Sequence, residues 1–160
     1  MIAFESRINT SSDQFAKNKD DLLKLVEKMR ALEKRAEAKS ELRRPVFDKR
    51  GQLSPSERLS ALLDTGMPFL ELYNMASYLV DDLDPETTIP GASVTLGIGL
   101  VSGVRCMVFI DDAGINAGAA TTKTVEKVLG GIEIALKQKL PLLHCVASAG
   151  ANLMTYTVEL

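Results

Sequence analysis

Apolar side chains recur at intervals of three, four and seven between residues 12 and 39, along a segment that is otherwise charged. They are Phe15, Leu22, Val26, Met29, Leu32 and Ala36. This period predicts a long amphipathic helix, with Ser11 as its N-cap and Gln14 completing a capping box. An isolated helix of this length is marginal in water, so we expect the stripe to pack on protein. The partner is the chain itself, a sister subunit or a coiled-coil helix.

The next segment is dense in charge, and a second helix signal follows it. Residues 34–50 are interpreted as a solvated connector. Ser54 is placed to cap a helix, Pro55 suits the first helical position, and Glu57 completes a capping box. We therefore expect a short helix that runs to about Asp64.

From residue 69 the pattern changes toward strands and turns. Residues 69–73 are predicted to form a strand, and residues 81–90, rich in Asp, Thr and Pro, an exposed loop or a substrate lid. Two apolar runs, 94–101 and 104–111, flank Ser102-Gly103, which is a two-residue hairpin signal. The second run is apolar on both faces, so we expect that strand to be buried.

A helix over residues 122–139 and a strand over 141–147 complete the predicted elements. The strand runs into the small-residue turn Ser148-Ala149-Gly150-Ala151. Such a turn brings bare backbone N–H groups close to a substrate oxygen, or it simply lets a core strand leave the interior. The pattern alone leaves both interpretations open.

Composition narrows the class of protein. The chain has 160 residues, 46% hydrophobic and 25% charged, with a net charge of −2, which is typical of one globular domain and gives no reason to expect nucleic acid or an anionic membrane as partner. No run approaches the ~20 apolar residues of a membrane-spanning helix, and the polar start lacks a secretory core. We therefore expect a cytoplasmic protein or a processed organellar one.

Histidine and cysteine offer little site chemistry. Cys106 and Cys145 lie in apolar runs without metal or redox spacing. His144 is the single histidine, so a histidine metal cluster is excluded. Its apolar neighbours favour a core or interface residue with one satisfied ring nitrogen over a catalytic base.

Several segments stand in a recognisable order. They are Gly51-Gln52-Leu53, Ser56-Glu57-Arg58-Leu59, Leu62-Leu63-Asp64, Pro68-Phe69-Leu70-Glu71-Leu72, the glycine-containing segment 111–119, the helical stretch 124–136 and the strand into the last turn. The ordered set resembles the carboxyltransferase (β) subunit of biotin-dependent acyl-CoA carboxylases, in particular those that act on methylcrotonyl-CoA or geranyl-CoA. The resemblance extends from about residue 5 to residue 153.

The resemblance implies an α/β fold of the crotonase superfamily. We expect an incomplete crotonase-like ββα superhelix preceded by an N-terminal helical arm. Residues 1–50 would form the arm and connector, and residues 51–160 the first, truncated part of the carboxyltransferase N-domain. A fragment, an early stop and a split subunit are all compatible with the sequence. A lone piece would leave strand edges and apolar surface uncovered, so it should associate.

The resemblance also implies a reaction, the transfer of CO2 from carboxybiotin to an acyl-CoA through an enolate. The backbone N–H groups of Ala149, Gly150 and Ala151 would form the oxyanion hole, while Gly118 and Ser148 would contact the substrate. Biotin would be carried by a biotin carboxylase or biotin carrier subunit, the chain would form a homo-oligomer, and no metal is expected. The implied location is the cytoplasm, or the mitochondrial matrix in a eukaryote.

Four positions depart from the family's usual pattern. Ala147 and Ala149 stand where the turn commonly has an acid and a glycine, Asn116 stands where the loop has a lysine, and Gly130 where the helix has an arginine. They motivate an alternative, a non-catalytic assembly or binding module of the crotonase fold. A crotonase-type hydratase is a third interpretation. The chain alone is expected to be inactive.

Overall fold

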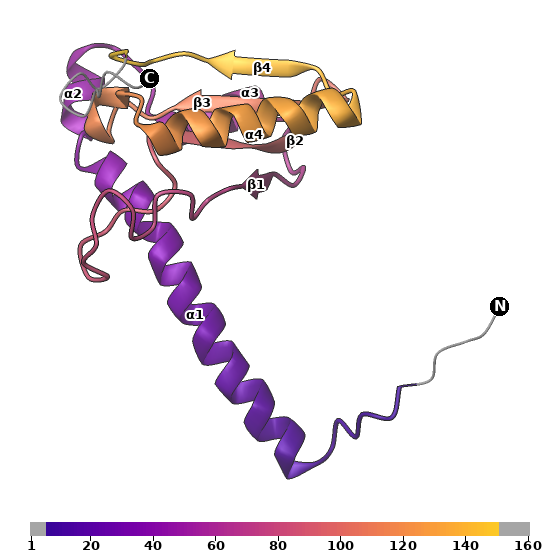
Figure 1. Ribbon diagram of the computed structural model, residues 1–160. Coiled ribbons are helices and arrows are strands. Elements are labelled where there is room, and N and C mark those ends of the chain that lie inside the picture. Colours follow the sequence, from indigo (N-terminus) through magenta and orange to yellow (C-terminus); the bar gives the residue numbers. More distant parts are fainter. Residues whose placement is uncertain (1–5, 151–160) are drawn as a thin grey trace. The chain divides into compact units, whose positions relative to one another are not determined.

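A computed structural model describes residues 6–150 of the chain (Figure 1). The chain divides into two units, residues 1–32 and 33–160, and each is described by itself below. The helices are α1 (Asp13–Glu41), α2 (Arg44–Lys49), α3 (Pro55–Leu62) and α4 (Thr122–Gln138), with a 3-10 turn, η1, at Asn116–Gly118. The strands are β1 (Leu70–Leu72), β2 (Val94–Val101), β3 (Val104–Asp111) and β4 (Leu142–Cys145).

The long N-terminal helix forms as predicted, but its cap is one residue later than expected. The Ser12 hydroxyl, not that of Ser11, accepts the Phe15 N–H at 3.2 Å. The Gln14 amide donates to Asn18 at 2.7 Å instead of completing a capping box. Two of the six residues of the apolar stripe are exposed, Leu22 at 61% and Met29 at 49%, and the other four are half-buried, so packing of the stripe on protein stays a prediction.

The segment interpreted as a solvated connector is mostly exposed, as predicted, but it is largely helical. α1 continues to Glu41, and α2 buries Phe47 to 4% exposure. Charged side chains in this segment are bound in place: Arg35 donates to the Pro85 carbonyl at 2.6 Å, and Arg44 pairs with Glu41 at 2.9 Å. The high charge of this segment concealed the burial of one aromatic side chain, and that burial favours the folded helix.

The sheet has the strand order β1-β2-β3-β4. β1 pairs with β2 and β2 with β3 in antiparallel register, whereas β3 and β4 are parallel. The predicted hairpin is confirmed, with Ser102 at φ 51 and Gly103 at φ 77, the positive pair that a two-residue turn requires. The Asp64 carboxylate accepts both turn amides at 2.7 Å, a support that the sequence analysis did not identify.

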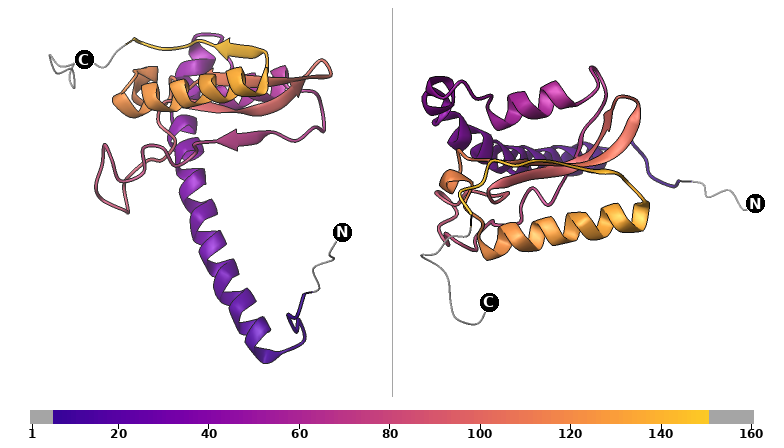
Figure 2. Two further views of the ribbon diagram at one scale, coloured as in Figure 1. Left: turned by 45° about the vertical axis from the view of Figure 1, so that its right-hand side comes forward. Right: turned by 90° about the horizontal axis from the view of Figure 1, so that it is seen from above.

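Helices cover both faces of this sheet (Figure 2). On the α4 side, Met107 and Phe109 of β3 are buried with Leu96. On the α3 side, Val108 and Ile110 are buried with Cys106. β3 is therefore the central buried strand, as its two apolar faces predicted, and the ββα unit β2-β3-α4 returns to the sheet through the parallel strand β4.

Both helices that flank the sheet have capping boxes. Ser54 and Glu57 form the predicted box of α3, and Thr121 with Thr124 forms that of α4.

On α4 the buried Lys127 ammonium donates to the Gly91 carbonyl at 2.9 Å. Burial lowers the pKa of Lys127 from 10.5 to about 8.

Two adjacent glycines let α4 approach the sheet closely. A Cβ at Gly131 would lie 2.8 Å from the ring of Phe109, which is fully buried. A Cβ at Gly130 would lie 2.9 Å from the hydroxyl of Tyr73, whose side chain is 46% exposed and free to move. The conformational cost of glycine in a helix is therefore offset by packing at Gly131 only.

We predict opposite effects for the two glycine-to-alanine substitutions. Gly131→Ala should destabilise the chain by about 1–3 kcal/mol, because the core has no room for the methyl group. Gly130→Ala should stabilise it by up to about 0.8 kcal/mol through helix propensity. Urea unfolding of the two variants provides the measurement, and shifts of the same sign would contradict the packing argument.

Candidate functional site

The candidate site lies where the C-terminal ends of β3 and β4 meet. Because the two strands are parallel, the segments that follow them reach the same edge of the sheet. The Ser148 hydroxyl donates to the Gly118 carbonyl at 2.7 Å, and the Ala120 N–H donates to the Gly150 carbonyl at 2.9 Å. The structure thus brings the predicted residues Gly118, Ser148 and Gly150 together, and Ala149 with them. Ala151 lies outside the described residues.

The backbone donors of the last turn are not equivalent. The Gly150 N–H donates to the Ser148 hydroxyl at 3.0 Å, so that hydroxyl is engaged on both sides within the protein. Among residues 6–150, the N–H groups of Ser148 and Ala149 have no hydrogen-bond partner. Of the predicted donors Ala149 and Gly150, Ala149 is therefore the one that this part of the chain leaves for a ligand. Substrate contacts of Ser148 and Gly118 stay predictions.

The loop opposite this turn has a left-handed backbone. Asn116, Ala117 and Gly118 have φ values of 49, 55 and 71 in succession. A Cβ at Gly118 would lie 2.5 Å from the Ala147 carbonyl oxygen, so only glycine fits there. Ala117 adopts a left-handed conformation that usually favours glycine, and its Cβ makes this conformation sterically strained.

One buried carboxylate connects β3 to the turn. The Asp111 side chain accepts from His144 Nε2 at 2.8 Å with one oxygen and from the Ala147 N–H at 3.0 Å with the other. The His144 ring also meets the Phe109 ring edge-on, with centroids 5.6 Å apart. His144 thus has the single satisfied nitrogen that the sequence predicted, but its side chain is 32% exposed, so it is not a core residue of the described chain. From α3, Arg58 donates to the backbone carbonyls of Asp111 and Cys145.

The neighbouring carboxylate organises the opposite loop. One oxygen of Asp112 accepts both the Ser40 hydroxyl and the Gly114 N–H, each at 2.8 Å. Burial raises the pKa of Asp112, and these hydrogen bonds oppose the rise. The sequence analysis assigned no role to Asp111 or Asp112. The available signal was two adjacent acids at the end of the apolar run 106–110, since acids are seldom buried without partners.

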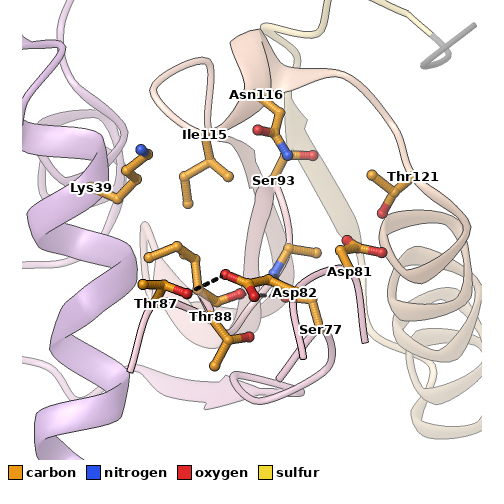
Figure 3. Close-up of a pocket in the computed structure, with 12 residues that line it drawn as sticks. Lys39, Ser77, Asp81, Asp82, Thr87, Thr88, Ser93, Ile115, Asn116 and Thr121 are labelled. Atoms are coloured by element: carbon orange, nitrogen blue, oxygen red, sulfur yellow. Dashed lines mark hydrogen bonds between the residues drawn. The ribbon is translucent and has the colours of Figure 1, made fainter. Parts of the chain in front are cut away.

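A pocket of about 370 Å³ lies beside this loop (Figure 3). Ile115, Asn116 and Thr121 line it from the loop side, and residues of the 81–90 loop line it from the other. The Asp82 carboxylate accepts from the Asp84 N–H at 3.0 Å and the Thr87 hydroxyl at 2.7 Å, which holds the pKa of Asp82 below its usual range. The prediction of an exposed loop over 81–90 is confirmed for residues 81–87, whereas Thr88 and Pro90 are buried.

The charges that line this pocket are mixed. Lys39 is the one cation among the lining residues, which also include Asp81 and Asp82.

Within residues 6–150, no group of three or more His, Cys, Asp or Glu side chains is placed to hold a metal ion. None of the described helices has the length and apolar character needed to cross a membrane.

Comparison with protein families decides the kind of domain. Residues 47–159 match the model of the carboxyl transferase domain. The chain belongs to this family. The region from α2 through the turn at 148–150 is therefore carboxyl transferase domain, and the crotonase-like α/β fold expected from the sequence is confirmed.

Relatives with curated names point to the same family. Over 105 residues the chain is 42% identical to the biotin-dependent 3-methylcrotonyl-coenzyme A carboxylase beta1 subunit of Mycobacterium tuberculosis, covering 65% of this chain and 19% of that protein. It is 36% identical over 104 residues to the mitochondrial methylcrotonoyl-CoA carboxylase beta chain of Dictyostelium discoideum, covering 65% and 17%. The chain thus spans about a fifth of the length of these relatives.

Solved structures show the same fold. The beta subunit of geranyl-CoA carboxylase from P. aeruginosa matches 96% of this chain and 28% of its own, with a TM-score of 0.87 and 37% identity. Transcarboxylase 12S, a hexamer solved with methylmalonyl-coenzyme A, matches 80% of this chain and 25% of its own, with a TM-score of 0.69 and 25% identity.

We predict that Ala117→Gly stabilises the carboxyl transferase domain. Glycine adopts the left-handed conformation of this position without the ~1 kcal/mol that alanine pays for it, and its greater freedom in the unfolded chain offsets part of this gain. The expected net change is up to about 0.5 kcal/mol in the free energy of unfolding. Denaturant titration tests it, with Ala113→Gly as control, because Ala113 has an ordinary negative φ. Destabilisation by Ala117→Gly would contradict the strain assigned to this loop.

Proposed function

We propose that the chain is part of the carboxyltransferase component of a biotin-dependent acyl-CoA carboxylase. The observation that carries this proposal is the turn at 148–150, which follows the parallel strand β4 and leaves the Ala149 N–H without a partner among the described residues. β4 is exposed or half-buried along its length, and not the buried strand that its apolar sequence predicted. Membership of the carboxyl transferase family supports it. The named activities of the relatives suggest the substrate, a methylcrotonyl-CoA or geranyl-CoA type of thioester.

The reaction requires charge to be held on the thioester oxygen. The α-carbon of the acyl chain, or the γ-carbon of an α,β-unsaturated thioester, loses a proton to the biotin nitrogen from which CO2 is released. The resulting enolate or dienolate then forms the new C–C bond with that CO2. Backbone N–H groups of Ala149, Gly150 and Ala151 form the proposed oxyanion hole, each donor contributing about 3–4 kcal/mol to the transition state. In the described conformation the Gly150 N–H is satisfied by Ser148, so substrate must compete with that hydroxyl for it.

Biotin supplies the carboxyl group and accepts the proton, and we propose that a biotin carboxylase or biotin carrier subunit brings it to the site. No side chain of this chain is assigned to hold it. The loop at 116–118 has no cation, so we do not assign the CoA phosphates to it. The proposal includes a homo-oligomer in the cytoplasm or mitochondrial matrix, with the arm and connector at 1–50 and the first part of the N-domain at 51–160.

One observation favours the alternative, a non-catalytic module of the same fold. Two groups of the turn, the Ser148 hydroxyl and the Gly150 N–H, are satisfied by each other and by the loop, as expected of a turn with a structural role. The two functions differ in turnover. A module would bind the biotin-bearing subunit and leave every acyl-CoA uncarboxylated.

Gly150→Val tests the proposed oxyanion hole. Gly150 has φ 92 and open space around its Cβ position, so valine perturbs the local backbone without a steric clash. We expect kcat for acyl-CoA carboxylation to fall about 100- to 1,000-fold, because the donors act on charge that develops in the transition state. The measurement uses the full-length polypeptide supplied with its biotinylated partner.

Gly66→Val is the matched control. Gly66 has φ 78 and equally open surroundings, but it lies in the connection after α3. The strain of a branched residue at positive φ is therefore similar in the two variants, while only Gly150 lies in the candidate site. If kcat of folded Gly150→Val stayed within a few-fold of the Gly66→Val value, the turn would have no part in the mechanism.

A further inference from the structure

We infer that Asp111 is a positioning residue that sets the backbone of the turn at 147–150, an inference that rests on the proposed function of that turn. Asp111 is the last residue of β3, and its side chain is 10% exposed. Both carboxylate oxygens are used, one by His144 Nε2 and one by the Ala147 N–H. The two donors lie on either side of the end of β4, so one carboxylate fixes where that strand stops and the turn begins.

The contact with Asp111 also fixes which ring nitrogen of His144 carries a proton. A carboxylate accepts hydrogen bonds and donates none, so the contact at 2.8 Å requires the proton to lie on Nε2 of the histidine ring. The ring rests edge-on against the buried Phe109, which limits its rotation. Asp111 therefore fixes both a ring and a backbone amide with one charged group, and charged hydrogen bonds are the stronger kind.

The hydrogen bonds of Ala147 and Ser148 restrain the backbone directly before the proposed donor, the Ala149 N–H. Ala147 is held by Asp111, and Ser148 is held by the Gly118 carbonyl at 2.7 Å. The next amide is that of Ala149, which the described residues leave without a partner. An oxyanion hole depends on donors fixed before the reaction, and a displacement of about 1 Å costs on the order of 100-fold in rate.

Asp111→Leu and Asp111→Asn separate the hydrogen bonds from the rest of the side chain. Leucine has a similar shape and accepts neither donor. Asparagine accepts the Ala147 N–H through its oxygen and donates through its nitrogen to Nε2 of His144, which requires the ring proton to move to Nδ1. Asparagine should therefore restore the turn while reversing the tautomer of the histidine.

Asp64→Leu is the matched control. Asp64 is also a carboxylate that accepts two backbone amides, those of Ser102 and Gly103, and it lies at the hairpin end of β3, away from the turn. Its removal costs the fold a similar pair of hydrogen bonds. A general loss of stability would therefore appear in Asp64→Leu as well as in Asp111→Leu.

Two measurements need no activity. The chain has a single histidine, so a ¹⁵N-histidine label in the full chain reports on His144 alone. With the ring neutral, we expect Nε2–H in the parent chain and Nδ1–H in Asp111→Asn. Hydrogen exchange of the two hydrogen-bonded amides of this segment, those of Ala147 and Gly150, should be faster in Asp111→Leu than in the parent, and unchanged in Asp64→Leu and Asp111→Asn. An unchanged tautomer in Asp111→Asn, or unchanged exchange in Asp111→Leu, would overturn the inference.

The third measurement is carboxylation by the full-length polypeptide with its biotinylated partner. We expect Asp111→Leu to lose about 100-fold in kcat with little change in KM, and Asp111→Asn to recover most of the loss. Equal losses in the two Asp111 variants, or an equal loss in Asp64→Leu, would refute the positioning role. If the parent has no activity, the proposed function fails while the tautomer and exchange results still decide the role of Asp111.

Discussion

Two buried carboxylates at the end of one strand hold the candidate site together. A carboxylate away from water must be compensated by hydrogen bonds, and Asp111 and Asp112 find theirs in different segments. Asp111 takes donors from β4 and the turn, while Asp112 takes them from the end of α1 and from its own loop. The need to satisfy two adjacent charges therefore brings together segments that are far apart in the sequence.

The central strand makes this arrangement rigid. β3 is buried on both faces, and α4 approaches it closely enough that Gly131 contacts the Phe109 ring. Tightly packed interiors deform little, so the position of the end of β3 is well defined relative to α3 and α4. Asp111 is the last residue of this strand. The turn follows β4, but the hydrogen bond from the Ala147 N–H to Asp111 ties it to β3. Stabilisation of a transition state by backbone amides requires donors held in place in this way.

The sequence predicted the elements whose formation depends on residues only a few positions apart. The hairpin, the box of α3 and the burial of β3 were predicted because turn residues, capping residues and apolar runs act over a few positions. α2 was missed because the burial of Phe47 depends on distant residues. The roles of Asp64, Asp111 and Arg58 were missed for the same reason, since their partners lie 33 to 87 positions away.

The departures from the family pattern have a common structural meaning. The turn has alanine at 147 in place of the usual acid, yet a carboxylate still lies 3.0 Å from the Ala147 amide, because Asp111 supplies it from β3. Asn116, which stands where the family loop has a lysine, holds a left-handed conformation with φ 49. Both changes alter how the backbone is supported and leave its amides in place. Since the proposed chemistry uses backbone donors, loss of these family side chains does not by itself argue for loss of turnover.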